Sequence, residues 1–145
     1  MAVKAQPDEY HTVTPNLVVD GAAKVIAFAT ETFGAKERMR MPMPDGRIAH
    51  AEIEVGDSVI MLSDSNGDFP AAPTYLHVYV QDCDAVYRKA LAAGGTALTE
   101  PKDEFYGDRA GNVLDPCGNR WTISTHVEDV SEAELEKRMA AMARA

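Results

Sequence analysis

The hydrophobic positions of the first sixty or so residues switch between strand-like and helix-like spacing. A β-rich run at 12–20 leads into residues 21–33, where apolar side chains recur every three or four positions on one helical stripe. Asp20 is expected to cap this helix and Gly34 to end it. Asp-Gly and Gly-Asp pairs suited to hairpin turns separate three further predicted strands, at 36–43, 47–55 and 58–63.

The same order of elements recurs after a polar, proline-rich joint at 64–74. A strand at 75–80 precedes a helix at 85–93, and Asp82 is its expected N-cap. Asp20 and Asp82 lie 62 positions apart, and other landmarks repeat at a similar distance. This period indicates two copies of a β-α-β-β-β module and an α+β fold, because solenoid units are shorter. The second copy is completed by predicted strands at 96–101, 105–114 and 119–125.

One helix per module can cover only one face of its sheet. The second face must therefore be buried by the other module, by another chain or by a ligand. The final segment carries a capping-box pattern, with Ser131 as N-cap and Glu134 at the third helical position. Its narrow apolar stripe suits packing on its own domain or across a homodimer. The predicted organisation is a single domain at 1–130, with modules at about 10–63 and 75–125, and a C-terminal helix at 131–145.

Length and charge narrow the possible functions. A chain of 145 residues with 46% hydrophobic and 26% charged residues is typical of one globular domain. The net charge of −9 argues against a nucleic-acid partner, which would need clustered lysine and arginine. No apolar run suits a membrane span and the N-terminal sequence lacks a signal-peptide core, so a cytoplasmic protein is expected. Cys83 and Cys117 lack metal-binding spacing and are expected to remain thiols.

Four stretches, in this order, carry a family resemblance. They are TPNLVVDGAAKVIAFATETFGA, MPDGRIAHAEIEVGDSVIMLSD, LHVYVQDCDAVYRKALAAGG and FYGDRAGNVLDPCGNRWTIS. Together they resemble the vicinal-oxygen-chelate superfamily of glyoxalases, bleomycin-resistance proteins and extradiol dioxygenases, most closely its PhnB-like branch. The resemblance covers roughly residues 10–130. It implies two modules that form paired incomplete barrels around a cupped site for a small molecule, usually in a homodimer.

Enzymes of this superfamily typically hold a divalent metal between four strands, with His, Glu or similar ligands. The resemblance places those four positions at Thr14, Met61, Tyr75 and Thr122. A divalent ion needs anionic oxygen or imidazole ligands, which a thioether and a neutral threonine do not supply. We therefore expect no metal and no cofactor at these positions. Met61, Tyr75 and Thr122 would instead contact the small-molecule ligand.

Strand alternation indicates which side chains face the cup. His50 and Glu52 share one face of their strand, opposite a small and aliphatic set that suits packing under the helix. Imidazole with carboxylate is the usual equipment for proton transfer, so His50 and Glu52 are the candidate catalytic pair. A hydrogen-bonded structural histidine and a displaced metal ligand remain alternatives for His50. By the same alternation, His77 and Tyr79 are candidate ligand contacts.

The long hairpin near residue 106 adds two further candidate ligand contacts, Tyr106 and Arg109. Arg109 could offer its planar fork to a carboxylate or phosphate, or it could pair with Asp108 or Asp115 within the hairpin. Three functions remain open: a metal-free enzyme, a drug-sequestering binding protein, and a metal-dependent lyase or dioxygenase. A metal-free small-molecule protein ranks first, because the four metal positions lack suitable ligands.

Overall fold

The computed structural model describes residues 2–144 and contains two four-stranded sheets and three helices. The first module consists of β1 (Asn16–Val19), α1 (Ala22–Phe33), β2 (Lys36–Pro42), β3 (Ile48–Val55) and β4 (Ser58–Asp64). The second consists of β5 (Tyr75–Tyr79), α2 (Cys83–Ala92), β6 (Thr96–Asp103), β7 (Asp108–Leu114) and β8 (Arg120–His126). A third helix, α3 (Glu132–Ala143), follows. The α+β class and the two β-α-β-β-β modules are confirmed.

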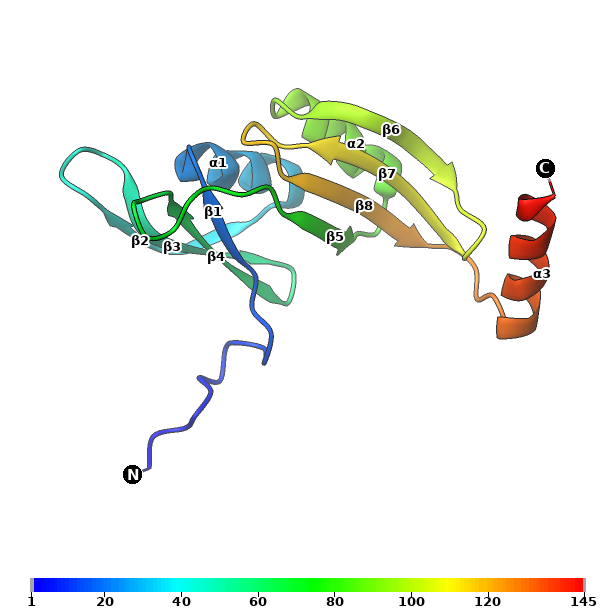
Figure 1. The fold of residues 1–145 in the computed structure, drawn as a ribbon, viewed down its shortest axis with the longest axis horizontal. Coiled ribbons are helices and arrows are strands. Elements are labelled where there is room, and N and C mark those ends of the chain that lie inside the picture. The colour runs from blue at the N-terminus through cyan, green and yellow to red at the C-terminus, as the bar shows by residue number, and fades with distance from the viewer. Residues whose placement is uncertain (1, 145) are drawn as a thin grey trace.

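The two sheets share one topology. Their strand orders are β1-β4-β3-β2 and β5-β8-β7-β6, so both are open sheets with free edges. In each, the first strand runs parallel to the last strand of its module, and the other neighbours are antiparallel. The sheets lie side by side, and α1 and α2 pack against each other (Figure 1). Each module therefore buries one sheet face under its helix and leaves the other face open.

The core joins the two modules through aromatic packing. Trp121 on β8 is fully buried, as strand alternation predicts, and its ring centroid lies 5.9 Å from that of Phe28 and 5.2 Å from that of Phe33. Both phenylalanines belong to α1 of the other module. Because burial of aromatic side chains contributes strongly to stability, this contact fixes the relative position of the two modules.

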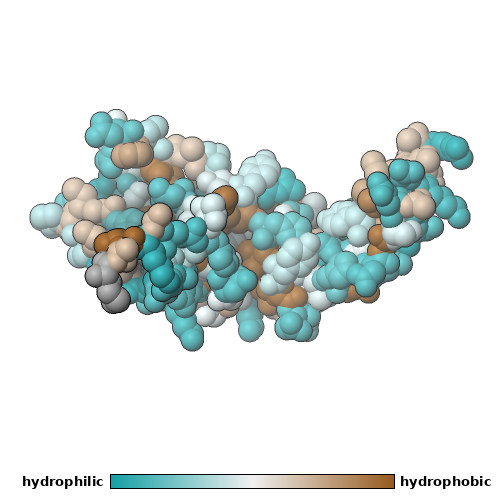
Figure 2. Space-filling view, turned by 90° about the horizontal axis from the view of Figure 1, so that it is seen from below, coloured by the Kyte–Doolittle hydropathy of each residue, from teal (hydrophilic) through white to brown (hydrophobic). Residues whose placement is uncertain are grey.

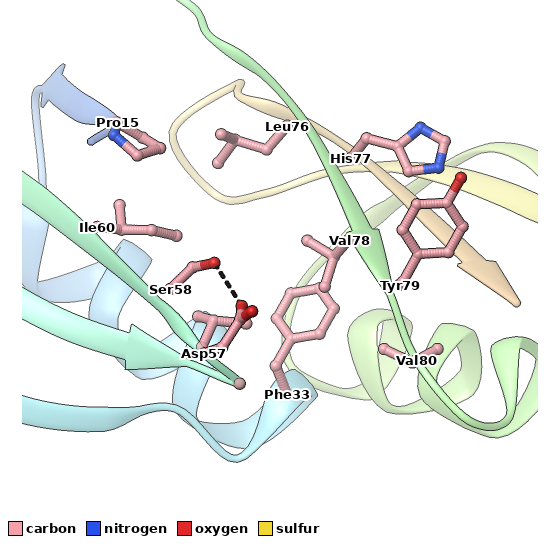
Figure 3. A pocket seen from close by; sticks show the side chains of 12 residues that line it. Pro15, Phe33, Asp57, Ser58, Ile60, Leu76, His77, Val78, Tyr79 and Val80 are labelled. Atoms are coloured by element: carbon pink, nitrogen blue, oxygen red, sulfur yellow. Dashed lines mark hydrogen bonds between the residues drawn. The ribbon is translucent and has the colours of Figure 1, made fainter. Parts of the chain in front are cut away.

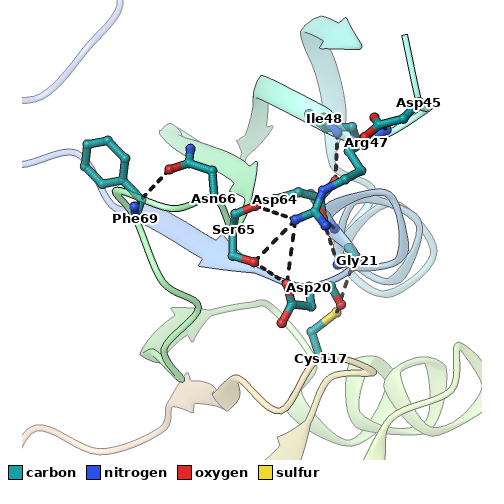
Figure 4. Close-up of polar contacts among 11 residues, drawn as sticks. Asp20, Gly21, Asp45, Arg47, Ile48, Asp64, Ser65, Asn66, Phe69 and Cys117 are labelled. Atoms are coloured by element: carbon teal, nitrogen blue, oxygen red, sulfur yellow. Dashed lines mark hydrogen bonds and ion pairs between the residues drawn. The ribbon is translucent and has the colours of Figure 1, made fainter. Parts of the chain in front are cut away.

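The N-terminus of α1 is capped from a distant strand rather than by Asp20. The expectation for Asp20 is wrong: the N-cap residue is Gly21, without a side-chain cap. Asp64, at the end of β4, accepts hydrogen bonds from the backbone N–H groups of Gly21 (2.8 Å) and Ala22 (2.9 Å), and its second oxygen accepts from Ile48 (2.7 Å) (Figure 4). Burial alone would raise the pKa of Asp64, but these hydrogen bonds outweigh burial and lower it.

The C-terminal helix stands away from the body of the molecule (Figure 2). Ser131 caps it as predicted, by accepting a hydrogen bond from the Glu134 N–H (3.2 Å), and α3 buries none of its residues. Arg138 ties it to the domain through Glu128 and the Phe105 carbonyl. Its apolar stripe is not buried on its own domain, since Met139 and Met142 are both more than half exposed. Across residues 2–144, no helix is long and apolar enough to cross a membrane.

Candidate functional site

The open face of the first module gathers three methionines around a carboxylate and an imidazole. His50 and Glu52 lie two positions apart on β3 and share this face, while Ala51 and Ile53 point the other way and are fully buried. In the sheet register, Met61 on β4 and Met39 on β2 both lie beside Glu52, and Met41 lies beside His50. We call this set, with Tyr10 and Arg38 described below, the module-one face.

Glu52 is the buried centre of the module-one face. It is 5% exposed, and its two oxygens accept hydrogen bonds from the Tyr10 hydroxyl (2.5 Å) and from His50 Nε2 (2.9 Å). The Arg38 guanidinium lies 4.0 Å away. Burial alone would raise the pKa of Glu52, but the hydrogen bonds from Tyr10 and His50 outweigh burial and lower it. Glu52 is therefore an ionised carboxylate, and it contacts an imidazole whose side chain is 32% exposed.

Tyr10 belongs to this site although it precedes the first strand. Its ring lies under the Arg38 guanidinium, 5.1 Å from the centroid, and the hydrogen bond to Glu52 raises the pKa of its hydroxyl. Arg38 also pairs with Glu9. Tyr10, Thr14 and Met61 border a recess of about 470 Å³, whose other walls come from Ala5, Gln6, Pro7, His11 and Thr12. The sequence offers no signal for this contact, because 42 positions separate Tyr10 from Glu52 and no periodic element contains Tyr10.

The four positions that would hold a metal do not carry a suitable ligand set. The register places Asn16, not Thr14, beside Met61, and His77, not Tyr75, beside Thr122. The neighbours are therefore an amide, a thioether, a hydroxyl and one imidazole. The Thr122 hydroxyl donates to Asn112 (2.6 Å). Within residues 2–144, no group of three or more His, Cys, Asp or Glu side chains could hold a metal ion. A divalent cation needs more oxygen or imidazole ligands than these positions provide.

A second buried carboxylate lies in the other module. Asp108, 3% exposed at the start of β7, accepts hydrogen bonds from the Tyr79 hydroxyl (2.9 Å) and from His126 Nδ1 (2.9 Å). His77 Nε2 lies 3.9 Å from the same carboxylate, and its ring centroid is 4.9 Å from that of Tyr79. Hydrogen bonds to Asp129 and then Asp108 raise the pKa of His126. Strand alternation predicts His77 and Tyr79 on this face, but it gives no sign that Asp108 and His126 are their partners.

The remaining candidate ligand contacts lie outside these two groups of side chains. Tyr75 is 77% exposed and lies beneath the Arg120 guanidinium, and Tyr106 packs edge-on against Phe105. Arg109 donates to both oxygens of Asp84 (2.7 and 3.0 Å) and contacts Asp103 (3.3 Å). The pairs considered above, with Asp108 or Asp115, do not form. The planar fork of Arg109 is therefore occupied by α2 and β6, and it holds the pKa of Asp84 below its usual value.

A largely apolar cavity of about 480 Å³ lies between the two modules and is lined by residues of both (Figure 3). Leu76 and Val78 form its β5 wall, and Phe33 and Ile60 face them from the first module. His77 and Tyr79, two of the side chains predicted to contact ligand, also line this cavity. It lacks a buried carboxylate, so it can hold apolar surface but offers little proton chemistry.

Comparisons with known proteins agree with the geometry. A family model described as Glyoxalase/Bleomycin resistance protein/Dioxygenase superfamily matches residues 10–123. Mb0911c of Mycobacterium bovis is 34% identical, with 97% of each chain covered, and Rv0887c of Mycobacterium tuberculosis is 34% identical, with 97% of this chain and 86% of its own covered. Both carry names that describe them as uncharacterized.

Solved structures show the same fold. TioX from Micromonospora sp. ML1 superimposes with a TM-score of 0.69 at 21% identity, over 81% of this chain and 99% of its own. A PhnB protein from Bacillus cereus superimposes with a TM-score of 0.61 at 22% identity, over 79% of this chain and 99% of its own. At these identities the likeness establishes the arrangement of strands and helices, and the chemistry must be argued from the side chains.

Proposed function

The chain belongs to the glyoxalase/bleomycin resistance protein/dioxygenase superfamily, and we propose that it is a small-molecule protein with a metal-free acid–base site. In this proposal the ligand lies on the module-one face. Glu52 accepts a proton or a hydrogen bond from the ligand, and His50 relays the proton to solvent. The recess of about 470 Å³ beside Tyr10 and Met61 is of the size that small-molecule sites have in proteins.

The observation that carries the proposal is the set of partners around Glu52. An ionised carboxylate is costly to bury unless it is paired and hydrogen-bonded. Both hydrogen bonds to Glu52 come from side chains, those of Tyr10 and His50, and each of these reaches the protein surface. A ligand can therefore replace either partner without breaking the sheet. A buried carboxylate with a perturbed pKa beside a surface recess is a candidate functional group, and the pKa of Glu52 is lowered in this way.

The methionines define what else the ligand contacts. Met39 and Met41 are 38% and 52% exposed on the same face as Glu52, and Met61 borders the recess. Thioether side chains are flexible and polarizable, and they adapt to irregular apolar ligands. The ligand is accordingly expected to combine an apolar body with one acidic or hydrogen-bonding group.

A binding assay with variants tests this function. A panel of small molecules is screened against the wild-type protein by thermal shift, because any ligand that prefers the folded state raises the melting temperature. Hits are then measured with His50→Ala, Glu52→Gln and the control Glu37→Gln, whose carboxylate pairs with Arg40. Loss of affinity or turnover in the two site variants but not in the control supports the proposal. Unchanged affinity and turnover in Glu52→Gln would reject it.

Sequestration of a cationic drug is the second candidate function. The net charge of −9 and two of the buried carboxylates, Glu52 and Asp108, favour a positively charged ligand. In that case cationic antibiotics raise the melting temperature and no turnover follows. His50→Ala separates the two candidate functions. In an acid–base enzyme this change removes turnover but not ligand affinity. In a pure binding protein there is no turnover to lose, and ligand affinity stays unchanged.

We also propose that the chain forms a homodimer. The open sheet faces carry large exposed side chains, among them Met41, Tyr75 (77% exposed) and Tyr79 (62% exposed). A second copy is the most economical cover for such a surface, because it removes apolar area from water on both chains at once. Light scattering after size exclusion should give twice the chain mass of 15.7 kDa. A monomer at micromolar concentration would reject the dimer.

A further inference from the structure

Tyr10 sits on the module-one face as a bound ligand would. Its hydroxyl donates to Glu52 at 2.5 Å, and its ring lies beneath the Arg38 guanidinium, 5.1 Å from the centroid. Met61, which pairs with Glu52 across the sheet, borders the same recess as Tyr10, and the other walls of that recess belong to the N-terminal segment itself. A phenol would find all its contacts here: the Glu52 carboxylate would accept from its hydroxyl, the Arg38 guanidinium would lie above its ring, and the Met61 thioether would contact its apolar edge.

The segment that carries Tyr10 is only lightly attached to the domain. Residues 2–14, the N-terminal arm, form no helix or strand and are mostly exposed, and the arm leads away from the body (Figure 1). Apart from the contacts of Tyr10 and Glu9 with the body, its hydrogen bonds are internal, such as the one from Gln6 to the Tyr10 carbonyl. Among the residues that the structure describes, its side-chain hydrogen bonds and ion pairs to the body are Tyr10–Glu52 and Glu9–Arg38. Release of the arm therefore breaks these two contacts, whose partners Glu52 and Arg38 are largely buried, but it breaks no strand pairing, so it is a local opening and not an unfolding of the sheet.

The second module provides an internal comparison. Tyr79 also donates its hydroxyl to a buried carboxylate, Asp108, at 2.9 Å. Tyr79, however, lies within β5, which is paired along its length with β8, so its hydroxyl cannot withdraw without breaking a sheet. The two modules thus hold similar tyrosine–carboxylate contacts, one on a fixed strand and one on a removable arm. Only the contact on the arm is built to be exchanged.

We propose that Tyr10 occupies the place of the ligand, and that the site binds a planar aromatic ring bearing a hydroxyl group after the arm has moved aside. This inference rests on the proposed function of the module-one face and gives its ligand a chemical class. The ligand hydroxyl replaces the Tyr10 hydroxyl on Glu52, and the ligand ring replaces the Tyr10 ring beneath Arg38. The arm acts as a competing internal ligand, so it lowers the affinity for weak ligands and selects for those that contact Glu52, Arg38 and Met61 better than Tyr10 does.

Free p-cresol, which is the tyrosine side chain as a separate molecule, tests the proposal. Its affinity is measured by ligand-detected NMR and calorimetry for full-length wild type, Tyr10→Ala, Tyr10→Ala with Glu52→Gln, and the control Glu37→Gln, whose carboxylate pairs with Arg40. Toluene serves as the probe without a hydroxyl. We expect p-cresol to bind Tyr10→Ala about tenfold or more tightly than wild type, because a hydrogen bond to a charged group is worth at least that factor. Toluene should bind more weakly, and Glu37→Gln should behave as wild type.

Several results would overturn the inference. They are equal p-cresol affinity for wild type and Tyr10→Ala, undiminished affinity after the added Glu52→Gln change, and equal affinity for toluene. Circular dichroism verifies that Tyr10→Ala is folded. If Tyr10→Ala does not fold, Tyr10→Phe replaces it: this variant keeps the ring but not the hydroxyl, and its gain in p-cresol affinity should be intermediate. If p-cresol does not bind while Glu52→Gln still abolishes binding of a panel ligand, the phenol assignment fails and the proposed function stands.

Discussion

Replacing one carboxylate oxygen by an amide should separate a functional carboxylate from a structural one in this protein. Glu52→Gln changes the centre of the module-one face. Asp115→Asn is its match, because Asp115 is equally buried, at 4% exposed, and lies in the turn between β7 and β8. Both changes preserve shape and remove a negative charge. The two carboxylates differ in whether their partners can adapt.

The partners of Asp115 cannot adapt. One of its oxygens accepts from two backbone N–H groups, and the other accepts from Trp121 Nε1 (2.8 Å) and Asn119 Nδ2 (2.9 Å). The indole nitrogen of Trp121 is only a donor. The side-chain amide of Asn119 cannot flip to offer its oxygen, because that oxygen already accepts from the Thr74 N–H. The new amide nitrogen would therefore face two fixed donors. At about 1–3 kcal/mol for each of the two unsatisfied donors, Asp115→Asn should lower the free energy of unfolding by about 2–6 kcal/mol.

The partners of Glu52 can adapt. A glutamine oxygen can still accept from Tyr10, and its NH₂ can donate to His50 Nε2, because a neutral imidazole accepts at one nitrogen in either tautomer. The loss of charge assistance is offset by relief of the cost of burying a charge. The free energy of unfolding should therefore fall by less than about 1 kcal/mol.

Urea denaturation at pH 7, followed by circular dichroism, measures both changes in one experiment. We expect a large fall in the unfolding midpoint for Asp115→Asn and a small one for Glu52→Gln, with loss of ligand affinity only in the latter. If Glu52→Gln destabilises as much as Asp115→Asn, Glu52 is a structural residue, and the assignment of the module-one face is wrong.

Three other predictions follow from the described contacts. The pKa of Asp64 is lower in the folded protein than the unfolded-state pKa of about 3.9. Asp64 therefore stabilises the fold fully above that unfolded-state pKa, and this stabilisation is lost as pH falls through the folded-state pKa. Asp64→Asn should accordingly flatten the acid limb of a profile of unfolding free energy against pH. Gly111→Ala should destabilise by about 1–3 kcal/mol in urea, because the added Cβ would lie 2.9 Å from the Tyr87 ring and 3.0 Å from a backbone nitrogen. In Arg109→Met the carboxyl of Asp84 should titrate at higher pH by NMR, without change in ligand affinity, since its pKa is lowered chiefly by that arginine.

The sequence predicts the framework well because local patterns determine it. The helical stripe at 21–33 and the capping aspartate at 82 correspond to α1 and α2, and the Ser131 cap corresponds to α3. Gly34 ends α1 in the left-handed conformation that glycine favours. These features depend on neighbours within one or two turns of chain, so periodicity and capping chemistry suffice to predict them.

The parts that escaped prediction depend on contacts between distant segments. Asp64 rather than Asp20 caps α1, because parallel pairing of β1 with β4 brings the end of β4 to the helix. The same pairing determines which residues lie side by side, and it places Asn16 rather than Thr14 beside Met61. Alternation gives the face of a side chain but not its register against another strand.

Metal analysis of the purified chain tests the central claim most directly. The claim is that Glu52 and His50 do their chemistry without a divalent ion, on a face whose neighbouring positions carry Met61 and Asn16. Protein prepared without chelators should contain far less than one equivalent of zinc, nickel, manganese or iron by mass spectrometry, and added metal should leave its melting temperature unchanged. Close to one equivalent of tightly held metal, lost together with ligand binding on chelation, would contradict the claim.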